Sequence, residues 1–220
     1  PNGKVIFVPY SSLNVGIYDP DTDTYTSGAA HGEGTFAFRS GVLLPNGNII
    51  FIPGSSANVG IYDPDTDIYT SGDAHGIFIP GGVSAFFGGV LAPNGNVIFV
   101  PSYSQNVGIY NPGTDTYTQG ALVGGSSGSF DGGALAPNGN IIFAPYGTTT
   151  LNVGIYDPGT DTYTPGAVHG EGFSAFAGAV LVPSGDVIFV PIGSSNVGIY
   201  DPDNSTIGQY YLMSAIPNKL

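Results

Sequence analysis

The sequence contains no cysteine and no tryptophan, and cationic residues are scarce. Without cysteine there are no disulfides and no thiol chemistry, so burial of apolar surface alone must hold the fold together. Only 3 Lys and Arg residues stand against 16 Asp and Glu residues, which gives a net charge of −13. The chain therefore lacks a basic surface able to neutralise phosphates, and nucleic acid is excluded as a partner.

Charged residues of either sign are few. They make up 9% of the chain, against about a quarter in a typical domain, while 41% of the residues are apolar and 36 are glycine. This composition favours an extracellular or surface-exposed protein, on a cell surface, an appendage or a virion. The chain has no initiator methionine and no apolar run long enough to span a bilayer, so we expect no membrane insertion and a processed product or a piece of a longer chain.

Two short motifs recur along the whole chain with one period. The heptapeptide Asn-Val-Gly-Ile-Tyr-Asp/Asn-Pro starts at Asn14, Asn58, Asn106, Asn152 and Asn196. The tripeptide Pro-Asn-Gly, replaced by Pro-Ser-Gly in the last copy, starts at Pro1, Pro45, Pro93, Pro137 and Pro183. Steps of 44 to 48 residues with no helical pattern inside the unit are typical of four-stranded propeller blades.

The repeat over residues 89–118 shows the four strands of one blade. Residues 89–92 form a short inner strand that ends at a Pro-Asn-Gly turn, and the apolar run 97–101 is a second strand covered on both faces. Residues 106–110 and 116–118 form the third and fourth strands, and a connection of about a dozen residues then returns to the axis. We predict an all-β fold, a five-bladed β-propeller of four-stranded antiparallel blades, as a single domain over residues 1–220.

The repeat resembles the blades of the kelch family and of the central domain of galactose oxidase. The resemblance lies in the segment Asn14-Val-Gly-Ile-Tyr-Asp-Pro-Asp-Thr-Asp-Thr-Tyr-Thr26 and its four relatives, and it covers nearly all of the chain. The double glycine of kelch units is replaced by a proline after the second strand, at Pro9, Pro53, Pro101, Pro145 and Pro191. The resemblance implies a scaffold used mostly to bind proteins or sugars.

Two recurring features are best explained structurally. A phenylalanine lies seven residues before the proline of the turn, at Phe38, Phe86, Phe130 and Phe176, and we expect these rings in the core. The sequence Asp-Pro-Asp-Thr-Asp at 19–23 and 63–67 imitates a calcium loop but lacks the glycine and glutamate of that pattern. Tight-turn chemistry is the better interpretation.

The histidines are the sharpest candidates for chemistry. His31, His75 and His169 each follow the last-strand tyrosine by six residues, on equivalent connections at one face. Three converging imidazoles would suffice for an open zinc site, with Glu33 and Glu171 as orienting groups or as a base. Duplication alone would also repeat these residues, so we expect no metal and no cofactor and keep the histidines as weak metal candidates.

Signatures of catalysis are absent, and we do not expect an enzyme. There is no Gly-x-Ser-x-Gly elbow, phosphate loop or dinucleotide fingerprint, although Asp73 and Asp131 could approach the axis. The loops between second and third strands add Tyr10, Tyr103 and Tyr146 to the face that carries the histidines. Aromatic loops around a shallow depression suit sugar stacking or a protein partner. The alternative is that these tyrosines merely face solvent.

We therefore expect a non-enzymatic interaction or structural module that binds a protein partner or copies of itself. A glycan-binding lectin-like propeller and a metal-assisted hydrolase that uses the loop His and Glu residues are the two alternatives. The candidate ligand-binding residues are Tyr10, His31, Glu33, His75, Tyr103, Tyr146, His169 and Glu171.

The final expectation concerns closure of the ring. The first repeat begins at its Pro-Asn-Gly turn and has no inner strand of its own, while residues 210–218 align with the inner-strand segment 38–46. We expect this tail to supply the missing strand, in the same molecule or in a neighbour, through Tyr210, Leu212, Ile216 and Pro217. Since Ile207 lies only three residues before Tyr210, the fifth blade should then lose or shorten its outer strand.

Overall fold

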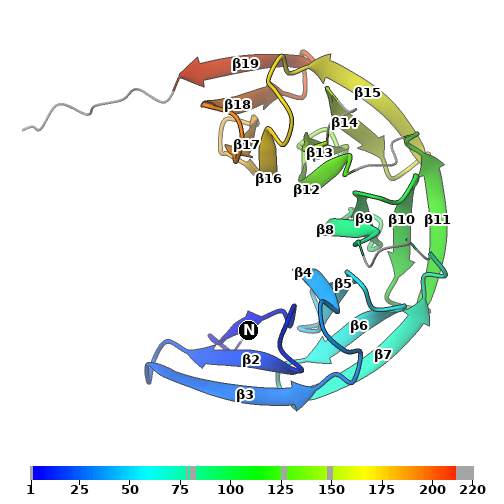
Figure 1. Ribbon diagram of the computed structural model, residues 1–220, viewed down its shortest axis with the longest axis vertical. Coiled ribbons are helices and arrows are strands. Elements are labelled where there is room, and N and C mark those ends of the chain that lie inside the picture. Colours follow the sequence, from blue (N-terminus) through cyan, green and yellow to red (C-terminus); the bar gives the residue numbers. More distant parts are fainter. Residues whose placement is uncertain (1, 78, 80–82, 125–127, 148–150, 212–220) are drawn as a thin grey trace, which may run out of the picture.

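The computed structural model describes residues 2–77, 79, 83–124, 128–147 and 151–211. Its strands form five antiparallel sheets that follow one another around an arc (Figure 1). The first sheet has the order β1-β2-β3, and each of the other four has four strands in chain order from the axis to the rim. The predicted all-β propeller architecture is confirmed, and each sheet is one blade.

The strand bounds repeat from blade to blade. Blade 1 contains β1 (Val5–Phe7), β2 (Asn14–Asp19) and β3 (Thr24–Ala30), and blade 2 contains β4 (Phe38–Leu43), β5 (Ile49–Pro53), β6 (Asn58–Asp63) and β7 (Ile68–Ala74). Blade 3 contains β8 (Phe86–Leu91), β9 (Val97–Pro101), β10 (Asn106–Asn111) and β11 (Thr116–Leu122). Blade 4 contains β12 (Phe130–Leu135), β13 (Ile141–Pro145), β14 (Asn152–Asp157) and β15 (Thr162–Val168). Blade 5 contains β16 (Phe176–Leu181), β17 (Val187–Pro191), β18 (Asn196–Asp201) and β19 (Thr206–Tyr211).

The Pro-Asn-Gly motif forms the turn between the inner and second strands. In blade 2, Asn46 Oδ1 accepts a hydrogen bond from the Asn48 N–H at 3.1 Å, and the Gly47 N–H donates to the Leu44 carbonyl at 3.0 Å. Gly47 has a φ of 94°, which glycine adopts without steric cost. The asparagine bond recurs in blades 3 and 4, so the repeated motif is a repeated turn.

The Asp-Pro-Asp-Thr-Asp segments form the turns between the third and fourth strands. Asp63 Oδ1 accepts hydrogen bonds from the Asp65 and Thr66 N–H groups at 2.9 and 3.3 Å. Asp67 ends the turn with a φ of 52°, a conformation that aspartate tolerates better than most residues. The interpretation of these segments as tight turns is confirmed.

Neighbouring blades pack through two different faces. At each of the four junctions, the earlier blade contributes mainly aliphatic side chains and the later blade contributes aromatic ones. Between blades 2 and 3, Ile50 and Ile52 share one buried core cluster with Phe86 and Phe99. The second strands of blades 2 to 4 are buried along nearly their whole length because neighbouring blades cover both faces. The recurring phenylalanines are fully buried, as predicted, at Phe38, Phe86, Phe130 and Phe176.

The described residues leave the arc open between blades 1 and 5 (Figure 1). Among the described residues blade 1 has no inner strand, as predicted. The outer strand of blade 5 was expected to be lost or shortened, but it is present as β19, so this expectation is wrong. β19 pairs with β18 over its full length, with Tyr210 opposite Val197. The chain continues the hairpin after its turn because local pairing satisfies the backbone polar groups. Leu212, Ile216 and Pro217 lie outside the described residues, and ring closure is not shown.

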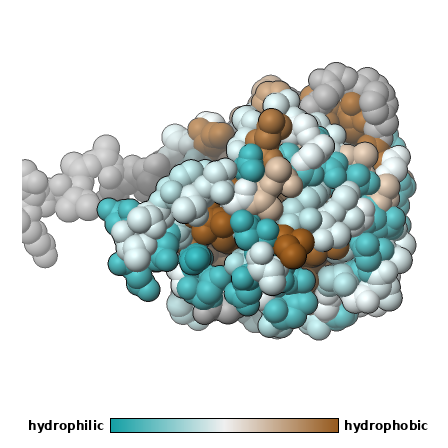
Figure 2. Space-filling model, turned by 90° about the horizontal axis from the view of Figure 1, so that it is seen from below, coloured by the Kyte–Doolittle hydropathy of each residue, from teal (hydrophilic) through white to brown (hydrophobic). Residues whose placement is uncertain are grey.

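One face of the molecule carries apolar patches among hydrophilic and neutral residues (Figure 2). Figure 2 shows the molecule from below, where brown apolar patches interrupt the teal surface. Large apolar side chains that are more than a third exposed include Phe7, Leu13, Tyr25 and Ile68. Within the described ranges, no helix is long and apolar enough to cross a membrane.

Candidate functional site

The inner strands of blades 2 to 5 share an irregularity directly after the repeated phenylalanine. In β4 the pairing register shifts between Phe38 and Ser40, and the other three inner strands shift at the equivalent place. A bulge of this kind re-aims a side chain, and bulges are common beside functional sites. The residue directly after the phenylalanine differs in each of these blades. It is Arg39 in blade 2, Phe87 in blade 3, Asp131 in blade 4 and Ala177 in blade 5.

Arg39, the only arginine of the chain, lies between two aromatic rings. Its Cζ is 4.6 Å from the ring centroid of Tyr10 and 4.4 Å from that of Phe87. Its Nε donates a hydrogen bond to Oγ of the buried Ser84 at 2.8 Å. The two cation–π contacts and this hydrogen bond restrict the orientation of the guanidinium. Among the described residues none accepts a hydrogen bond from its terminal nitrogens, which therefore can donate to a ligand.

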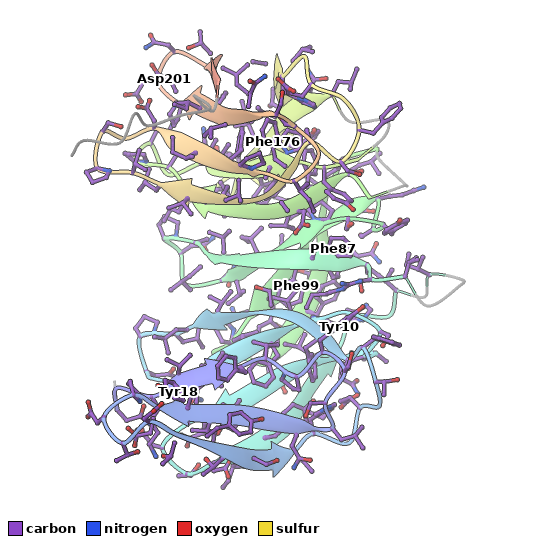
Figure 3. The ribbon with its side chains drawn as sticks, turned by 60° about the vertical axis from the view of Figure 1, so that its left-hand side comes forward. Tyr10, Tyr18, Phe87, Phe99, Phe176 and Asp201 are labelled. Carbon is purple, nitrogen blue, oxygen red and sulfur yellow. The ribbon has the colours of Figure 1, made fainter. Side chains whose placement is uncertain are left out.

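Phe87 is the centre of the cluster. Its ring centroid lies 6.4 Å from that of Tyr103 and 6.2 Å from that of Tyr146, within the range of favourable aromatic pairs. The three predicted tyrosines come from the loops between second and third strands of blades 1, 3 and 4, and Arg39 and Phe87 join them into one group. Figure 3 shows Tyr10 and Phe87 on the same side of the molecule, away from Tyr18 and Asp201.

Asp131 supplies the acidic group of this region. It is half-buried on β12, and β12 contacts the strand β8 that carries Phe87. Burial raises the pKa of its carboxyl group, and the charge of Arg39 partly lowers that pKa again. We call Tyr10, Arg39, Phe87, Tyr103, Asp131 and Tyr146 the bulge cluster. It offers a guanidinium that only donates hydrogen bonds, a carboxylate that accepts them, and aromatic surface from four rings.

The three histidines do not belong to this cluster. Each imidazole packs edge-on against the buried phenylalanine of the following blade, with ring centroids 5.5 to 6.0 Å apart, in the pairs His31 with Phe38, His75 with Phe86 and His169 with Phe176. His31 and His75 are therefore one blade apart, and His75 and His169 are two blades apart. The convergence that the zinc hypothesis requires is not found, and among the described residues no group of three His, Cys, Asp or Glu could hold a metal ion.

The polar contacts of the histidines are structural. His31 Nε2 donates to the Ser12 carbonyl at 2.9 Å, and its Nδ1 accepts from the Glu33 N–H at 3.2 Å. His75 makes the corresponding bonds to the Ser56 carbonyl and the Ile77 N–H. These rings fix the long connections against the preceding loops.

The two glutamates clamp the connections to the next blade. Glu33 accepts hydrogen bonds from the side chains of Ser56, Tyr69 and Ser71 at 3.0, 3.1 and 2.9 Å. Glu171 accepts one from Asn196 Nδ2 at 2.8 Å. A carboxylate held by three donors is poorly placed to act as a base. Asp73, also considered for the axis, lies on β7 at the rim and accepts from the Tyr117 N–H at 2.7 Å.

Sequence reasoning overlooked Arg39 and Phe87. Both follow a repeated phenylalanine at the one inner-strand position where the repeats differ in charge and aromatic character. A position that varies inside a strict repeat is free of the shared structural role, and this signal was present in the sequence.

Comparison with known proteins places the fold. No protein-family model matches the chain, and no curated protein matches it. Among solved structures, virginiamycin B lyase from Staphylococcus aureus aligns with a TM-score of 0.78 and 15% identity over 97% of this chain and 68% of the lyase. A streptogramin B lyase aligns with a TM-score of 0.76 and 15% identity over 96% and 66%. A fungal alcohol oxidase of the AA5 family, in complex with copper, aligns with a TM-score of 0.71 and 20% identity over 94% and 51%.

These neighbours correct one expectation. The chain is a β-propeller, and membership of the kelch family is not shown. The expectation that it is not an enzyme is contradicted, because the neighbours include lyases and an oxidase. At 15 to 20% identity the likeness is one of fold, and it carries no residue role over to this chain.

Proposed function

We propose that this propeller binds a neutral polyhydroxylated ligand, a saccharide, at the bulge cluster. The observation that carries the proposal is the contact of the Arg39 guanidinium with the rings of Tyr10 and Phe87. The carboxylate of Asp131 lies on β12, the inner strand that follows the strand of Phe87. Sugars present apolar C–H faces that stack on aromatic rings, and hydroxyl groups that both donate and accept hydrogen bonds.

The charges of the cluster argue against ionic ligands. An anion would be attracted by Arg39 but repelled by Asp131 and by the net charge of −13. A cation would be repelled by the guanidinium of Arg39. A neutral polyol uses both groups, since its hydroxyls accept from Arg39 and donate to Asp131.

The test is a glycan array followed by titration calorimetry with the strongest neutral saccharide. We expect the dissociation constant to rise about tenfold or more in Phe87→Ala, Arg39→Gln and Asp131→Asn, since each charge-assisted hydrogen bond or aromatic contact contributes about 1.4 kcal/mol or more. Asp203→Asn, which removes the same charge from an exposed outer turn, is the matched control. Absence of saccharide binding, or binding unchanged in all three variants, would refute the proposal.

The same samples address turnover. NMR spectra of the saccharide before and after incubation distinguish a ligand that is returned unchanged from one that is converted. Since enzymes share this fold, both outcomes are compatible with binding at the bulge cluster.

Location and repeat type form the rest of the proposal. The low charge content and 36 glycines support display outside the cytoplasm. Protease digestion of intact source cells or particles would test this, and full protection would contradict it. The Val-Gly-Ile-Tyr-Asp-Pro segments support a divergent kelch-like repeat.

A further inference from the structure

The aliphatic face of blade 5 is uncovered. Its residue Val190 is 45% exposed, whereas the equivalent residues Ile52, Val100 and Ala144 are fully buried against the next blade. Val180, on the inner strand, is 55% exposed, against 8 to 9% for the equivalent Val42 and Val90. Blade 5 thus presents the same surface that blades 2 to 4 bury, with nothing among the described residues covering it.

Within the described ranges, the aromatic face of blade 1 is uncovered in the same way. Phe7 is 51% exposed, whereas the equivalent Phe51, Phe99, Phe143 and Phe189 are fully buried. Tyr25 is 63% exposed, and its equivalents in blades 2 to 4 are half-buried. The two ends of the arc are therefore the two complementary halves of one interface, the interface that forms four times inside the molecule.

Blade 1 also has an open strand edge. Within the described part of the chain β1 pairs only with β2, and a hollow of about 250 Å³ lies beside it, lined by residues that include Ile6, Val8, Gly41 and Leu43. An unpaired edge with apolar neighbours is a template for another strand.

We propose that both end faces bind further blades of this same repeat type, about two in number, which fill the opening between β16–β19 and β1–β3. Continuity with the four internal interfaces supports this occupant, because such a blade offers an aromatic face to Val190 and an aliphatic face to Phe7. The size follows from the comparison above, since the lyase is longer than the aligned region by roughly two repeats of this length. A whole second copy would bring five blades, whereas the extra length of the lyase corresponds to about two.

The absence of cysteine makes burial at each end directly measurable. Val190→Cys and Phe7→Cys report the two ends, and Leu122→Cys, 66% exposed on the outer strand β11, is the control. Each variant is made in the 220-residue chain and in an extended chain. In the extended chain, residues 123–212 are repeated once after Leu212, which adds two blades. The rate of reaction with a maleimide is measured for all six proteins.

We expect labelling at positions 7 and 190 to be about tenfold slower, or more, in the extended chain, with no change at position 122. A matched extension in which the added copies of Phe143 and Phe189 are replaced by Asp should restore fast labelling. Fast labelling at both ends of the extended chain would overturn the proposal.

Two further results with the 220-residue chain would also overturn the proposal. Slow labelling together with a concentration-dependent mass would assign the faces to a second copy. Slow labelling in a monomer, reversed by deletion of residues 212–220, would assign them to the chain's own tail.

Discussion

Asp67 accepts a hydrogen bond from the Tyr62 hydroxyl at 3.0 Å, and the same carboxylate oxygen accepts one from the Ala29 N–H of the preceding blade at 2.8 Å. The arrangement recurs at Asp115 and Asp161, each of which joins the tyrosine of its own blade to a backbone N–H of the blade before. One carboxylate thereby couples a turn, a core tyrosine and a neighbouring blade.

Removal of this coupling should destabilise the fold. Asp67→Gly deletes the carboxylate, and glycine adopts the φ of 52° at this position without strain. Asp23→Gly is the matched control, since Asp23 has a φ of 50° and the same bond from Tyr18, but no described residue of a preceding blade donates to it. We expect urea denaturation to show a loss of unfolding free energy larger for Asp67→Gly by about 1–2 kcal/mol. Equal losses would show that the contact between blades contributes nothing.

Two glycines with similar backbone angles should respond differently to substitution. Gly132 has a φ of 82°, and a Cβ there would lie 2.8 Å from the Cα of Gly178 on the next inner strand. Gly139 has a φ of 88°, and a Cβ would meet nothing within 4 Å. Gly139→Ala should cost about 1 kcal/mol from backbone strain alone, and Gly132→Ala about 1–3 kcal/mol more because two backbones must separate. Thermal unfolding of both variants is the measurement, and similar melting temperatures would contradict the expected clash.

His75 should make the protein sensitive to mild acid. Burial lowers the pKa of its imidazole, and its bond to the Ser56 carbonyl opposes this in part. A lowered pKa in the folded state means that the stabilising contribution is complete above the unfolded value of about 6.5 and is lost as the pH falls below it. We expect the melting temperature of His75→Gln, which keeps a hydrogen-bond donor, to drop less between pH 7.5 and pH 5 than that of the unchanged protein. An identical drop would show that His75 does not carry this sensitivity.

Asp131 should behave in the opposite sense. Burial raises the pKa of its carboxyl group, so its contribution to stability is complete below the unfolded value and is lost as the pH rises through the folded value. Asp131→Asn should therefore raise the melting temperature at pH 7, by an amount that shrinks towards pH 3. Asp203→Asn, at an exposed turn, should show no such pH-dependent gain. A destabilised Asp131→Asn at pH 7 would mean that the electrostatic attraction of Arg39 outweighs the cost of burial.

The repeat predicted the fold well because each motif carries its own structural cause. Pro-Asn-Gly dictates a turn, and a buried run such as Val97–Pro101 dictates a strand covered on both sides. Tyr210 was placed wrongly, because its alignment with Phe38 ignored the pairing that β18 offers to β19. The pairing of β19 with the adjacent strand β18 determines the position of residues 206–211.

The site was predicted in part. The three loop tyrosines contact Arg39 or Phe87, which the sequence did not indicate. The histidines were expected to meet and instead pack into separate blade joints. The contact between Arg39 and Phe87 depends on the register shift in each inner strand and on the distance between neighbouring blades. Neither property can be read from the order of residues along one strand.

The unequal faces of the blades have an evolutionary consequence. A duplicated blade inserted anywhere in the array meets an aliphatic face on one side and an aromatic face on the other, so it fits without any new complementary substitution. Blade number is then free to change by recombination between near-identical repeats, whereas a substitution in one face is felt only by the adjacent blade. Lineages carrying this repeat should therefore differ in the number of units more readily than in the residues that join them.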